Sequence, residues 1–491
     1  MNIGDVNFNG LFPLIIFVIS ICSLTLFRSL IRTNYNLHRR VGVISTISAS
    51  SIVVISQLAR WRKFDQGLLG KKDLLTLNGL VSTDRISVIS ILVISLISIL
   101  VSLSASSYLK SRKDIPAGEF FILLQIVILG MFAFVMANDL VAIFIALETF
   151  SIPLYVLTAY DARRLRSLEA GFKYFIMGAV SSAIFLYGVA LHYGLTGSTA
   201  LVGVAENSSL ANVSMVLLSV GLLFKVAAFP FHFWSPDAYQ GAPSPITTFM
   251  SASTKLAAFV VFARLVSTNV IDAGINGPSG RVLLTLACLT SAIFGATVAL
   301  KQSNIKRAIA YSSISHTGYI LLAMKSGGSL ALGPVITYVI AYGFIIVGTY
   351  LVIGYLSTPN EQNDSILSIN ALAKTNPYIA GSLTVFLLAQ AGIPLTSGFI
   401  AKFEVFRVAL DSKFYITSLI VLIATVISAA FYLKLILSMY SDSFNHDTEK
   451  VIDVKANIVP KPTSIAIGVC VFITVAIGVF PSLLTGFTNV L

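Results

Sequence analysis

The sequence predicts an all-helical polytopic membrane protein with about fourteen transmembrane helices, and three observations point to that fold class. Of the 491 residues, 56% are hydrophobic and only 11% are charged, which is less than half the charged fraction of a typical soluble domain. The mean hydropathy is +0.88. The basic residues, which give a net charge of +12, lie in short clusters between apolar runs, as the flanking anchors of membrane helices do. This composition excludes a soluble enzyme, a nucleic-acid binder and a disordered protein.

The membrane spans can be placed one after another along the chain. A span needs about 20 mainly apolar residues. Segments that meet this condition lie near residues 11–27, 41–59, 86–106, 118–136, 138–158, 172–193, 213–234, 245–266, 282–300, 308–324, 331–356, 377–406, 414–439 and 463–483. The least distinct of these are the closely spaced pair around Asn138 and the unusually long segment 377–406.

The distribution of Lys and Arg predicts the orientation. More of them fall in the odd-numbered loops than in the even-numbered loops, although the second loop, from Arg60 to Arg85, breaks this pattern. The bias predicts odd loops on the cytoplasmic or matrix side and both termini on the opposite side. Residues 1–10 hold an Asp and no Lys or Arg, so neither a signal peptide nor a transit peptide is expected.

Four ionisable residues lie inside predicted spans: Glu148, Lys225, Lys255 and Lys402. A charge at the centre of a bilayer costs at least about 2.5–3.5 kcal/mol, so each group needs water, a partner or a neutral state. Desolvation disfavours the charged form of both Lys and Glu, which makes reversible titration easier. A row of such groups with water between them is what a proton path requires.

A purely structural role is the alternative for two of these four residues. Glu148 and Lys225 could form a buried ion pair that only fixes helix packing. The same explanation is harder to extend to Lys402, because its nearest acidic neighbour, Glu404, is two residues away and faces another side of a regular helix.

Two segments are interrupted by proline in corresponding halves of the chain. Pro230 interrupts the seventh segment, and Pro394, between Gly392 and Gly398, interrupts the twelfth. Each break has a lysine within eight residues. Interrupted segments at matching positions indicate an inverted-repeat transporter with ion sites at the breaks. A single proline kink without a function is common, so the pairing of each break with a lysine is the stronger signal.

Other polar residues give weaker indications. His316 lies within a span and could relay protons near neutral pH, although a hydrogen-bonded core histidine is an equally good interpretation. The sequence contains no Walker loop, no G-x-G-x-x-G run and no metal-binding motif, and its three cysteines have no CxxC spacing. No nucleotide, metal or iron–sulfur cofactor is therefore expected on this chain.

Several stretches resemble a known family. They are EAGFKYFIMGAVSSAIFLYG (169–188), FKVAAFPFHFWSPDAYQGAPSPITTFMSASTK (224–255), KRAIAYSSISHTGY (306–319), ALAKTNP (371–377) and AGIPLTSGFIAKF (391–403). They resemble the antiporter-like membrane subunits of respiratory complex I, and among these the N-type subunit, which is called subunit 2 in mitochondria. The resemblance covers residues 138–410, and the two ends of the chain are assigned by continuity.

The resemblance implies an architecture. Helices 4–8 and 9–13 would form two inverted repeats around broken helices 7 and 12. Residues 1–117 would then hold the first three helices, 118–266 the first repeat, 282–440 the second repeat, and 441–491 a loop and the fourteenth helix.

The resemblance also implies a role for each intramembrane polar residue. The input half-channel would use Glu148 and Lys225 as a coupled pair, the central relay would be Lys255, the exit group would be Lys402, His316 would connect them, and Lys173 would be a further relay.

The function implied is proton translocation driven by NADH:ubiquinone electron transfer in other subunits. This chain would bind no cofactor, while NADH, FMN, iron–sulfur clusters and ubiquinone would belong to the rest of the complex. Its partners would be other membrane-arm subunits and lipids, with no nucleic acid. The expected location is the mitochondrial inner membrane, with a bacterial plasma membrane as the alternative. Two other functions stay open: a subunit of an Mrp-type cation/proton antiporter, and a structural membrane-arm subunit that does not pump.

Overall fold

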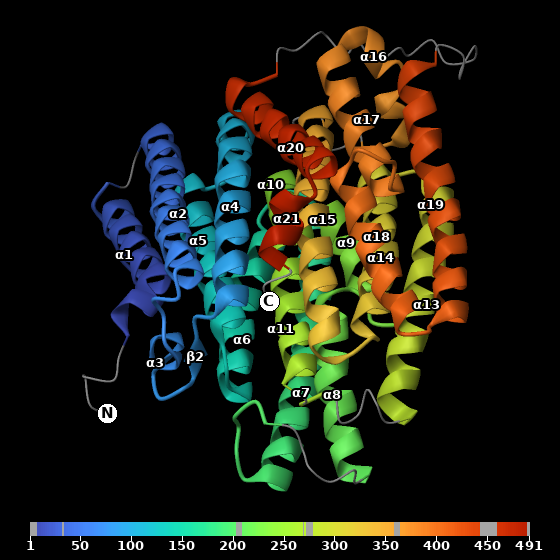
Figure 1. Cartoon of the computed structure of the whole chain (residues 1–491). Helices are drawn as coiled ribbons and strands as arrows, with labels where there is room; N and C mark the ends of the chain where they lie inside the picture. Colours follow the sequence, from blue (N-terminus) through green and yellow to red (C-terminus); the bar gives the residue numbers. More distant parts are fainter. Residues whose placement is uncertain are drawn as a thin grey trace.

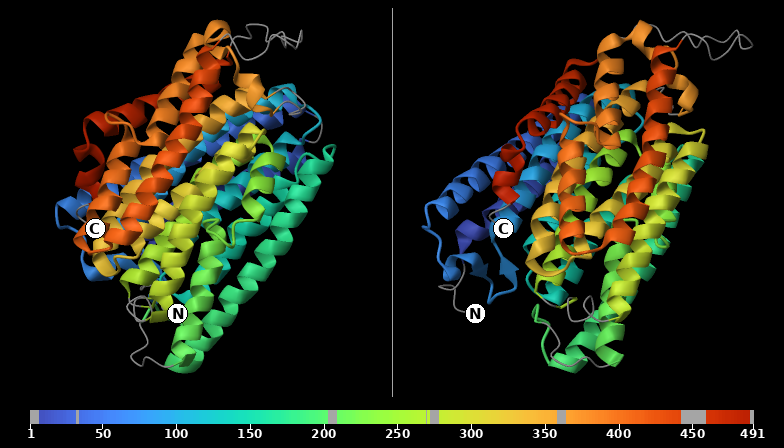
Figure 2. Two further views of the ribbon diagram at one scale, coloured as in Figure 1. Left: turned by 90° about the vertical axis from the view of Figure 1, so that its right-hand side faces the viewer. Right: turned by 45° about the vertical axis from the view of Figure 1, so that its right-hand side comes forward.

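Long apolar helices run side by side and make up nearly all of the computed structural model (Figures 1 and 2). The structure describes residues 7–31, 34–202, 209–268, 270–271, 278–357, 364–441 and 459–488. The N-terminal helices lie at one side of the bundle and α13 and α19 at the other (Figure 1). Two helical pairs project beyond their neighbours: α7 and α8 at one end, and α16 and α17 at the opposite end.

The N-terminal part of the chain contains six long helices and one small hairpin. The helices are α1 (Phe8–Leu30), α2 (Tyr35–Asp65), the short α3 (Lys71–Leu74), α4 (Arg85–Ser111), α5 (Ala117–Met136), α6 (Leu140–Thr158) and α7 (Leu165–Thr196). Strands β1 (Leu75–Thr76) and β2 (Val81–Ser82) pair in antiparallel fashion with Leu75 opposite Ser82. The hairpin occupies the second loop, between α3 and α4.

The middle and C-terminal parts contain the interrupted helices. They comprise α8 (Ser209–Lys225), α9 (Trp234–Gly241), α10 (Ser244–Phe249), the π-helix η2 (Met250–Thr254), α11 (Lys255–Ser267), α13 (Pro278–Lys301), α14 (Ile305–Met324), α15 (Gly328–Leu356), the 3-10 helix η3 (Ile366–Ile369), α16 (Leu372–Thr375), α17 (Pro377–Ala391), α18 (Ser397–Asp411), α19 (Tyr415–Tyr440), α20 (Lys461–Val479) and α21 (Ser482–Thr488). The last of the long helices, α20, crosses the bundle obliquely (Figure 1).

The predicted spans agree with these helices. Each of the fourteen predicted segments falls on helix, and within the described residues eleven helices are long and apolar enough to cross a membrane. The chain is therefore an all-helical, multi-pass membrane protein. The long segment 377–406 is two helices, α17 and α18, and the seventh segment ends its first helix at Lys225. Most of the loop predicted in 441–491 lies outside the described residues.

Helix α14 lies in the middle of the second half and contacts α9, α13, α15, α18 and α19. Its contact with α13 is unusually close because two glycines allow the backbones to touch. A Cβ atom at Gly295 would lie 2.4 Å from the backbone nitrogen of Ser315, and one at Gly318 would lie 2.6 Å from that of Ala292. Any larger side chain at either glycine would push α13 and α14 apart.

Ion pairs fasten the helix ends together. Arg264 of α11 donates to the Asp84 carboxylate at 3.0 Å and to the Val135 carbonyl at 3.1 Å, which joins α11 to the start of α4 and the end of α5. Burial alone would raise the pKa of Asp84, but the Arg264 guanidinium and the hydrogen bonds from Ser87 hold that pKa below its ordinary value. Asp84 also caps α4 by accepting from the Ser87 backbone at 2.9 Å.

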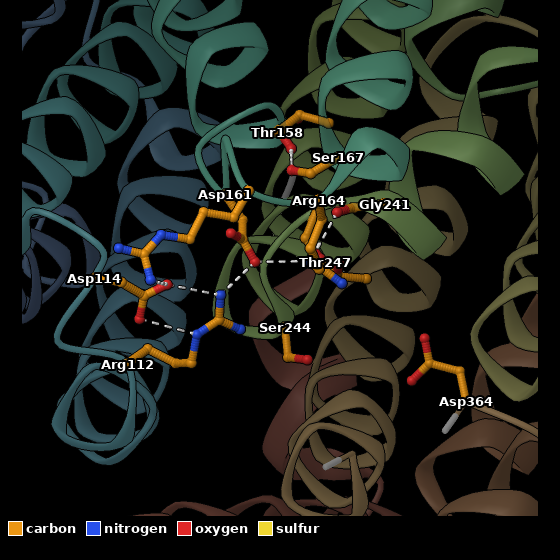
Figure 3. A network of polar contacts seen from close by, with 12 residues as sticks. Arg112, Asp114, Thr158, Asp161, Arg164, Ser167, Gly241, Ser244, Thr247 and Asp364 are labelled. Atoms are coloured by element: carbon orange, nitrogen blue, oxygen red, sulfur yellow. Dashed lines mark hydrogen bonds and ion pairs between the residues drawn. The ribbon is translucent and has the colours of Figure 1, made fainter. Parts of the chain in front are cut away.

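A second ionic cluster lies where α4, α6 and α9 end. Arg112 contacts the buried Asp161 carboxylate at 2.5 Å, and Arg164 contacts the same carboxylate at 2.7 Å (Figure 3). Arg164 also donates to the Gly241 carbonyl at 2.9 Å. Asp114 completes the cluster at 3.2 Å from Arg112. These contacts fix the position of α9 and so of the interrupted helix to which it belongs.

Candidate functional site

The first helix interruption follows Lys225. Helix α8 ends at that residue, Ala227 has a left-handed backbone with a φ of +56°, and helix resumes at Trp234. The Trp234 indole donates to the Phe224 carbonyl at 2.9 Å, and the Phe229 backbone N–H donates to the Ser291 hydroxyl at 2.8 Å. The break predicted at Pro230 is therefore confirmed. Backbone groups that the interruption leaves without helical hydrogen bonds find other partners.

Lys225 is 2% exposed and is held by neutral groups. Its Nζ donates to the Ser151 hydroxyl at 2.7 Å and to the Tyr155 hydroxyl at 3.3 Å, both on α6. The ring of Phe150 lies 5.5 Å from the same nitrogen. Aromatic faces at this distance stabilise a lysine cation.

Glu148 lies one turn before Ser151 on α6, and Tyr155 lies one turn after it. The spacing of three and then four residues places all three side chains on one face of the helix. Within the described residues no ion pair joins Glu148 to Lys225, and the Glu148 Oε1 atom is buried without a hydrogen-bond partner. The purely structural ion pair considered from the sequence is not formed. Glu148 instead shares one face of α6 with Ser151 and Tyr155, whose hydroxyls accept from Lys225.

Lys255 begins α11, directly after the π-helix η2, and is 3% exposed. Its Nζ donates to the Ser313 carbonyl and hydroxyl, both at 2.6 Å, and to the Thr317 hydroxyl at 3.0 Å. Thr317 in turn donates to the carbonyl of Val226 at 2.9 Å. Thr317 therefore connects Lys255 to the peptide that follows Lys225. Single-turn π-helices often occur at functional positions.

The second interruption separates α17 from α18. Helix α17 ends at Ala391, Gly392 follows with a φ of +90°, and α18 begins at Ser397. A Cβ atom at Gly398 would lie 1.8 Å from the Ala389 carbonyl oxygen, so only glycine permits this close approach of the two half-helices. The break predicted around Pro394 is confirmed.

Lys402 fills the end of the α17 half-helix. Its Nζ donates to the carbonyls of Gln390 and Ala391 at 2.8 and 2.9 Å, which are free because the helix ends there. The side chain is 6% exposed. Glu404 pairs with Arg407 at 2.5 Å rather than with Lys402, as the helix geometry predicted. Lys402 also reaches the floor of a half-open groove of about 610 Å³ between α18 and α19.

His316 lies on α14 between the two lysines. Its Nδ1 is 2.7 Å from the Tyr338 hydroxyl, and its Nε2 is 3.0 Å from the Tyr432 hydroxyl. Tyr432 also hydrogen-bonds to Ser312 on the same helix as His316. Ser312 lies 3.5 Å from the side-chain oxygen of Gln390, whose carbonyl binds Lys402. Polar contacts therefore run from the α14 helix to the second break.

Helix α14 is the common element of this arrangement. Ser313 and Thr317 of α14 bind Lys255, Ser312 and His316 lead towards Gln390, and Tyr319 places its ring 5.0 Å from the Lys402 Nζ. We call the set of Glu148, Lys225, Lys255, His316 and Lys402, with the hydroxyls that join them, the lysine axis. Among the described residues, no carboxylate lies within 4.0 Å of any of its three lysines.

Lys173 lies outside the lysine axis. Its side chain is 42% exposed and pairs with Glu169 at 2.6 Å and with Asp237 at 2.9 Å. Asp237 also binds Arg307. The structure thus gathers Lys225, Lys255, His316 and Lys402 around α6 and α14 and places Glu148 on the face of α6 that carries the partners of Lys225. Lys173 lies apart, in a half-exposed ionic cluster.

The sequence reasoning counted several buried cations as loop residues, among them Arg264, Lys306 and Lys325. Arg264 is 4% exposed and pairs with Asp84, while Lys306 is fully buried and lies 3.5 Å from Asp364. Lys325 is also buried and donates to the Thr417 hydroxyl at 3.0 Å. In each case the partner is distant in sequence, and only the apolar residues on both sides of the cation could have signalled its burial.

The part of the chain that the structure describes holds no group of three or more His, Cys, Asp or Glu side chains suited to a metal ion. The lysine axis offers hydroxyls, carbonyls, amines and one imidazole. These groups can accept and donate protons, and none of them is a redox centre.

Comparison with known proteins identifies the family. Residues 137–428 match the family described as NADH:quinone oxidoreductase/Mrp antiporter, transmembrane. The chain belongs to this family. The matched range contains Glu148, Lys225, Lys255, His316 and Lys402.

Two bacterial relatives are both named NADH-quinone oxidoreductase subunit N. The one from Rhodococcus opacus (strain B4) is 40% identical over 361 residues, which is 72% of this chain and 65% of the relative. The one from Mycobacterium tuberculosis (strain ATCC 25618 / H37Rv) is 39% identical over 381 residues, which is 75% of this chain and 70% of the relative. The alignments thus span about two thirds of the length of these relatives.

Two solved structures share the fold. A chain of respiratory complex I from Thermus thermophilus superposes with a TM-score of 0.79 and 28% identity, and the match covers 96% of this chain and 98% of that one. A chain of the Mrp complex from Dietzia sp. DQ12-45-1b gives a TM-score of 0.82, with 98% and 96% coverage, at only 19% identity. The second match concerns the fold alone. Because both curated relatives are bacterial, they match the bacterial plasma membrane alternative rather than the mitochondrial membrane.

Proposed function

We propose that this chain is the N-type antiporter-like subunit in the membrane arm of an NADH-quinone oxidoreductase and that it carries protons along the lysine axis. Its partners are then the other membrane-arm subunits and the surrounding lipids. NADH, FMN, iron–sulfur clusters and the quinone act in other subunits. The names of the bacterial relatives and the fold match to respiratory complex I support this assignment.

One observation carries the proposal. Three buried lysines, Lys225, Lys255 and Lys402, are held by hydroxyls and backbone carbonyls instead of carboxylates. A lysine in a close buried ion pair is held in its charged state, since removing either charge leaves the other unpaired at a cost of about 3–5 kcal/mol. Neutral partners impose no such penalty on proton release. The three sites are therefore suited to change protonation in turn.

The contacts suggest the order of transfer. Glu148 exchanges a proton with Lys225 through the Ser151 turn, and Thr317 joins the neighbourhood of Lys225 to Lys255. From Lys255 the path follows α14 to His316 and Tyr432, and then to Gln390 and Lys402. Hydroxyl groups both donate and accept, so each can pass a proton by reorienting. Bridging waters would complete the longer steps.

The energies involved are compatible with this scheme. Moving one charge against 100 mV requires about 2.3 kcal/mol. Bringing two opposite charges to 4 Å contributes about 4 kcal/mol at an effective dielectric constant of 20. Opening or closing the approach between Glu148 and Lys225 thus changes the proton affinity of Lys225 by an amount similar to the work of one translocation. This is how electron transfer elsewhere in the complex would be coupled to the lysine axis.

The decisive experiment replaces Lys225 in the intact complex. We expect Lys225→Met to assemble, because methionine fills the same space, and to lower the proton yield per NADH oxidised by at least about tenfold in proteoliposomes. The matched control is Lys434→Met, since Lys434 is an exposed lysine on α19. An assembled Lys225→Met complex with a normal proton yield would leave only a structural role for the chain.

Sodium transport is the second candidate, because the family also includes Mrp antiporters. The fold match to the Mrp chain favours no particular ion at its level of identity. Replacing sodium by choline in the same proteoliposomes separates the two functions. Proton pumping should be independent of sodium, whereas an antiporter would lose its activity.

A further inference from the structure

A buried ion pair at one end of α14 lies outside the lysine axis. Lys306, in the first turn of α14, is 0% exposed, and Asp364 is 4% exposed. The Nζ of Lys306 lies 3.5 Å from Asp364 Oδ1, which is a long separation for an ion pair. We call these two residues the uptake pair. Two backbone bonds hold their segments together: Ile305 N–H to the Asp364 carbonyl at 2.8 Å and Ile366 N–H to the Ser303 carbonyl at 2.9 Å.

The Asp364 carboxylate is incompletely satisfied. Its Oδ1 accepts from the Ser357 hydroxyl at 3.1 Å, but its Oδ2 is buried without a hydrogen-bond partner. A buried carboxylate oxygen that lacks a donor costs free energy. A narrow crevice beside Asp364, between the ends of α14 and α15 and η3, is too tight for a water molecule in this conformation.

A stripe of hydroxyls leads from the uptake pair to the lysine axis. Lys306 donates to the Ser244 hydroxyl at 3.2 Å. From Ser244, the residues Thr248, Ser251 and Lys255 follow at intervals of four, three and four, so all four share one face of the α10–η2–α11 helix. The Thr248 hydroxyl donates to the Ser244 carbonyl at 2.8 Å, and the Ser251 hydroxyl donates to the Thr248 carbonyl at 3.0 Å. Eleven residues of helix bridge about 16 Å.

The uptake pair differs from the arginine cluster at the same end of the bundle. Ser244 and Asp364 appear in Figure 3 together with Arg112, Asp161 and Arg164. Arg112 binds Asp161 at 2.5 Å and cannot release a proton, so that contact is a fixed anchor. Lys306 can release a proton, and its distance to Asp364 is longer than that of Arg112 to Asp161. The second carboxylate oxygen of Asp364 has no hydrogen-bond partner.

We propose that Lys306 and Asp364 take up protons at this end of the bundle and pass them through the Ser244, Thr248 and Ser251 hydroxyls to Lys255. This inference rests on the proposed function, since it assigns the supply of the same proton path. The Lys306 ammonium gives its proton to the Ser244 side, and Asp364, protonated from the aqueous side, then returns a proton to the Lys306 amine. Each cycle leaves both groups as they began and moves one proton inward.

The test separates proton transfer from a structural ion pair. Lys306→Arg keeps the charge and the contact with Asp364 but cannot deprotonate at any physiological pH. We expect this variant to assemble in the intact complex and to lose at least about tenfold in coupled proton translocation in proteoliposomes. Asp364→Asn should behave alike, while Asp364→Glu should restore most of the rate. The matched control is Lys301→Arg, at an exposed lysine on the same end of the bundle.

Native gels establish assembly for each variant before its proton yield is read. Normal yield in assembled Lys306→Arg would overturn the uptake role and leave a structural pair. If Lys306→Arg is normal while Lys225→Met is impaired, the uptake inference fails and the proposed function stands. If both are normal, both fail. Should Lys306→Arg not assemble, the Asp364→Asn and Asp364→Glu pair decides: equal yields overturn the proposal, and loss with recovery supports it.

Discussion

Two buried arginines near helix ends pair with carboxylates, whereas the three lysines of the lysine axis meet only hydroxyls and carbonyls. Arg264 pairs with Asp84, and Arg112 with Asp161, at 3.0 and 2.5 Å. Lys225 and Lys402 have no such partner among the described residues. The first arrangement fixes a charge and fastens helices together, and the second leaves a proton free to move. Residue type follows the same division, because arginine stays protonated and lysine can change state.

The sharpest way to break this comparison is to place an arginine inside the bundle. Lys255→Arg keeps a cation and its donors to Ser313 and Thr317 but prevents proton release. We expect coupled proton translocation in proteoliposomes to fall by at least about tenfold, with assembly retained. Lys434→Arg, on the exposed face of α19, is the control. Wild-type pumping by the Lys255→Arg complex would mean that the charge alone matters.

A smaller but still large effect is expected when the second break is distorted. In Gly398→Ala the new methyl group would lie 1.8 Å from the Ala389 carbonyl, so the half-helices must separate and Lys402 must lose its carbonyl partners. Turnover should fall about threefold to tenfold, a barrier increase of about 0.7–1.4 kcal/mol. Gly381→Ala is the matched control, because nothing lies within 4 Å of its added Cβ. Equal rates for the two variants would contradict this reading of the break.

Loss of the arginine pairs at the helix ends should lower stability rather than pumping. Arg264→Met leaves Asp84 without its cation, which should cost about 3 kcal/mol because the pair is mostly buried. The amount of assembled complex in membranes should then drop several-fold. The proton yield per NADH of the complex that does assemble should stay unchanged. A reduced yield at normal abundance would place Arg264 in the proton path.

The smallest effect is expected at Lys173. Its half-exposed side chain takes part in ion pairs with Glu169 and Asp237 of the kind that contribute about 0–1 kcal/mol. Lys173→Met should therefore change the proton yield by less than about twofold. A loss comparable to that of Lys255→Arg would return Lys173 to the path that the family resemblance implied.

The helices and the two breaks could be predicted from the sequence, because they depend on local signals. Apolar runs of sufficient length gave the spans, and Pro230 and Pro394 beside glycines or lysines gave the interruptions. The exact start of the first break could not be predicted, since α8 ends at Lys225, five residues before Pro230. The left-handed Ala227 and the anchoring of Trp234 to Phe224 decide that position, and neither has a distinctive sequence pattern.

The partners of the lysines could not be predicted in the same way. Lys255 binds Ser313 and Thr317, which follow it by 58 and 62 residues, and such pairings depend on how helices pack. Lys306 was counted as a loop cation because it precedes the predicted segment 308–324, and only the approach of Asp364 explains its burial. Charges inside apolar runs were therefore identifiable as a set, while the contacts that connect them were not.

The tight glycine contact between α13 and α14 has a mechanical consequence. With Gly295 against Ser315 and Gly318 against Ala292, these two helices can neither rotate nor slide independently without a steric clash. The hydroxyls and the imidazole of α14 thus belong to a rigid pair of helices. A conformational change transmitted to this subunit must therefore move the half-helices at the two breaks relative to α13 and α14. Such a movement brings the lysines closer to, or further from, acceptors on α14 that stay in place.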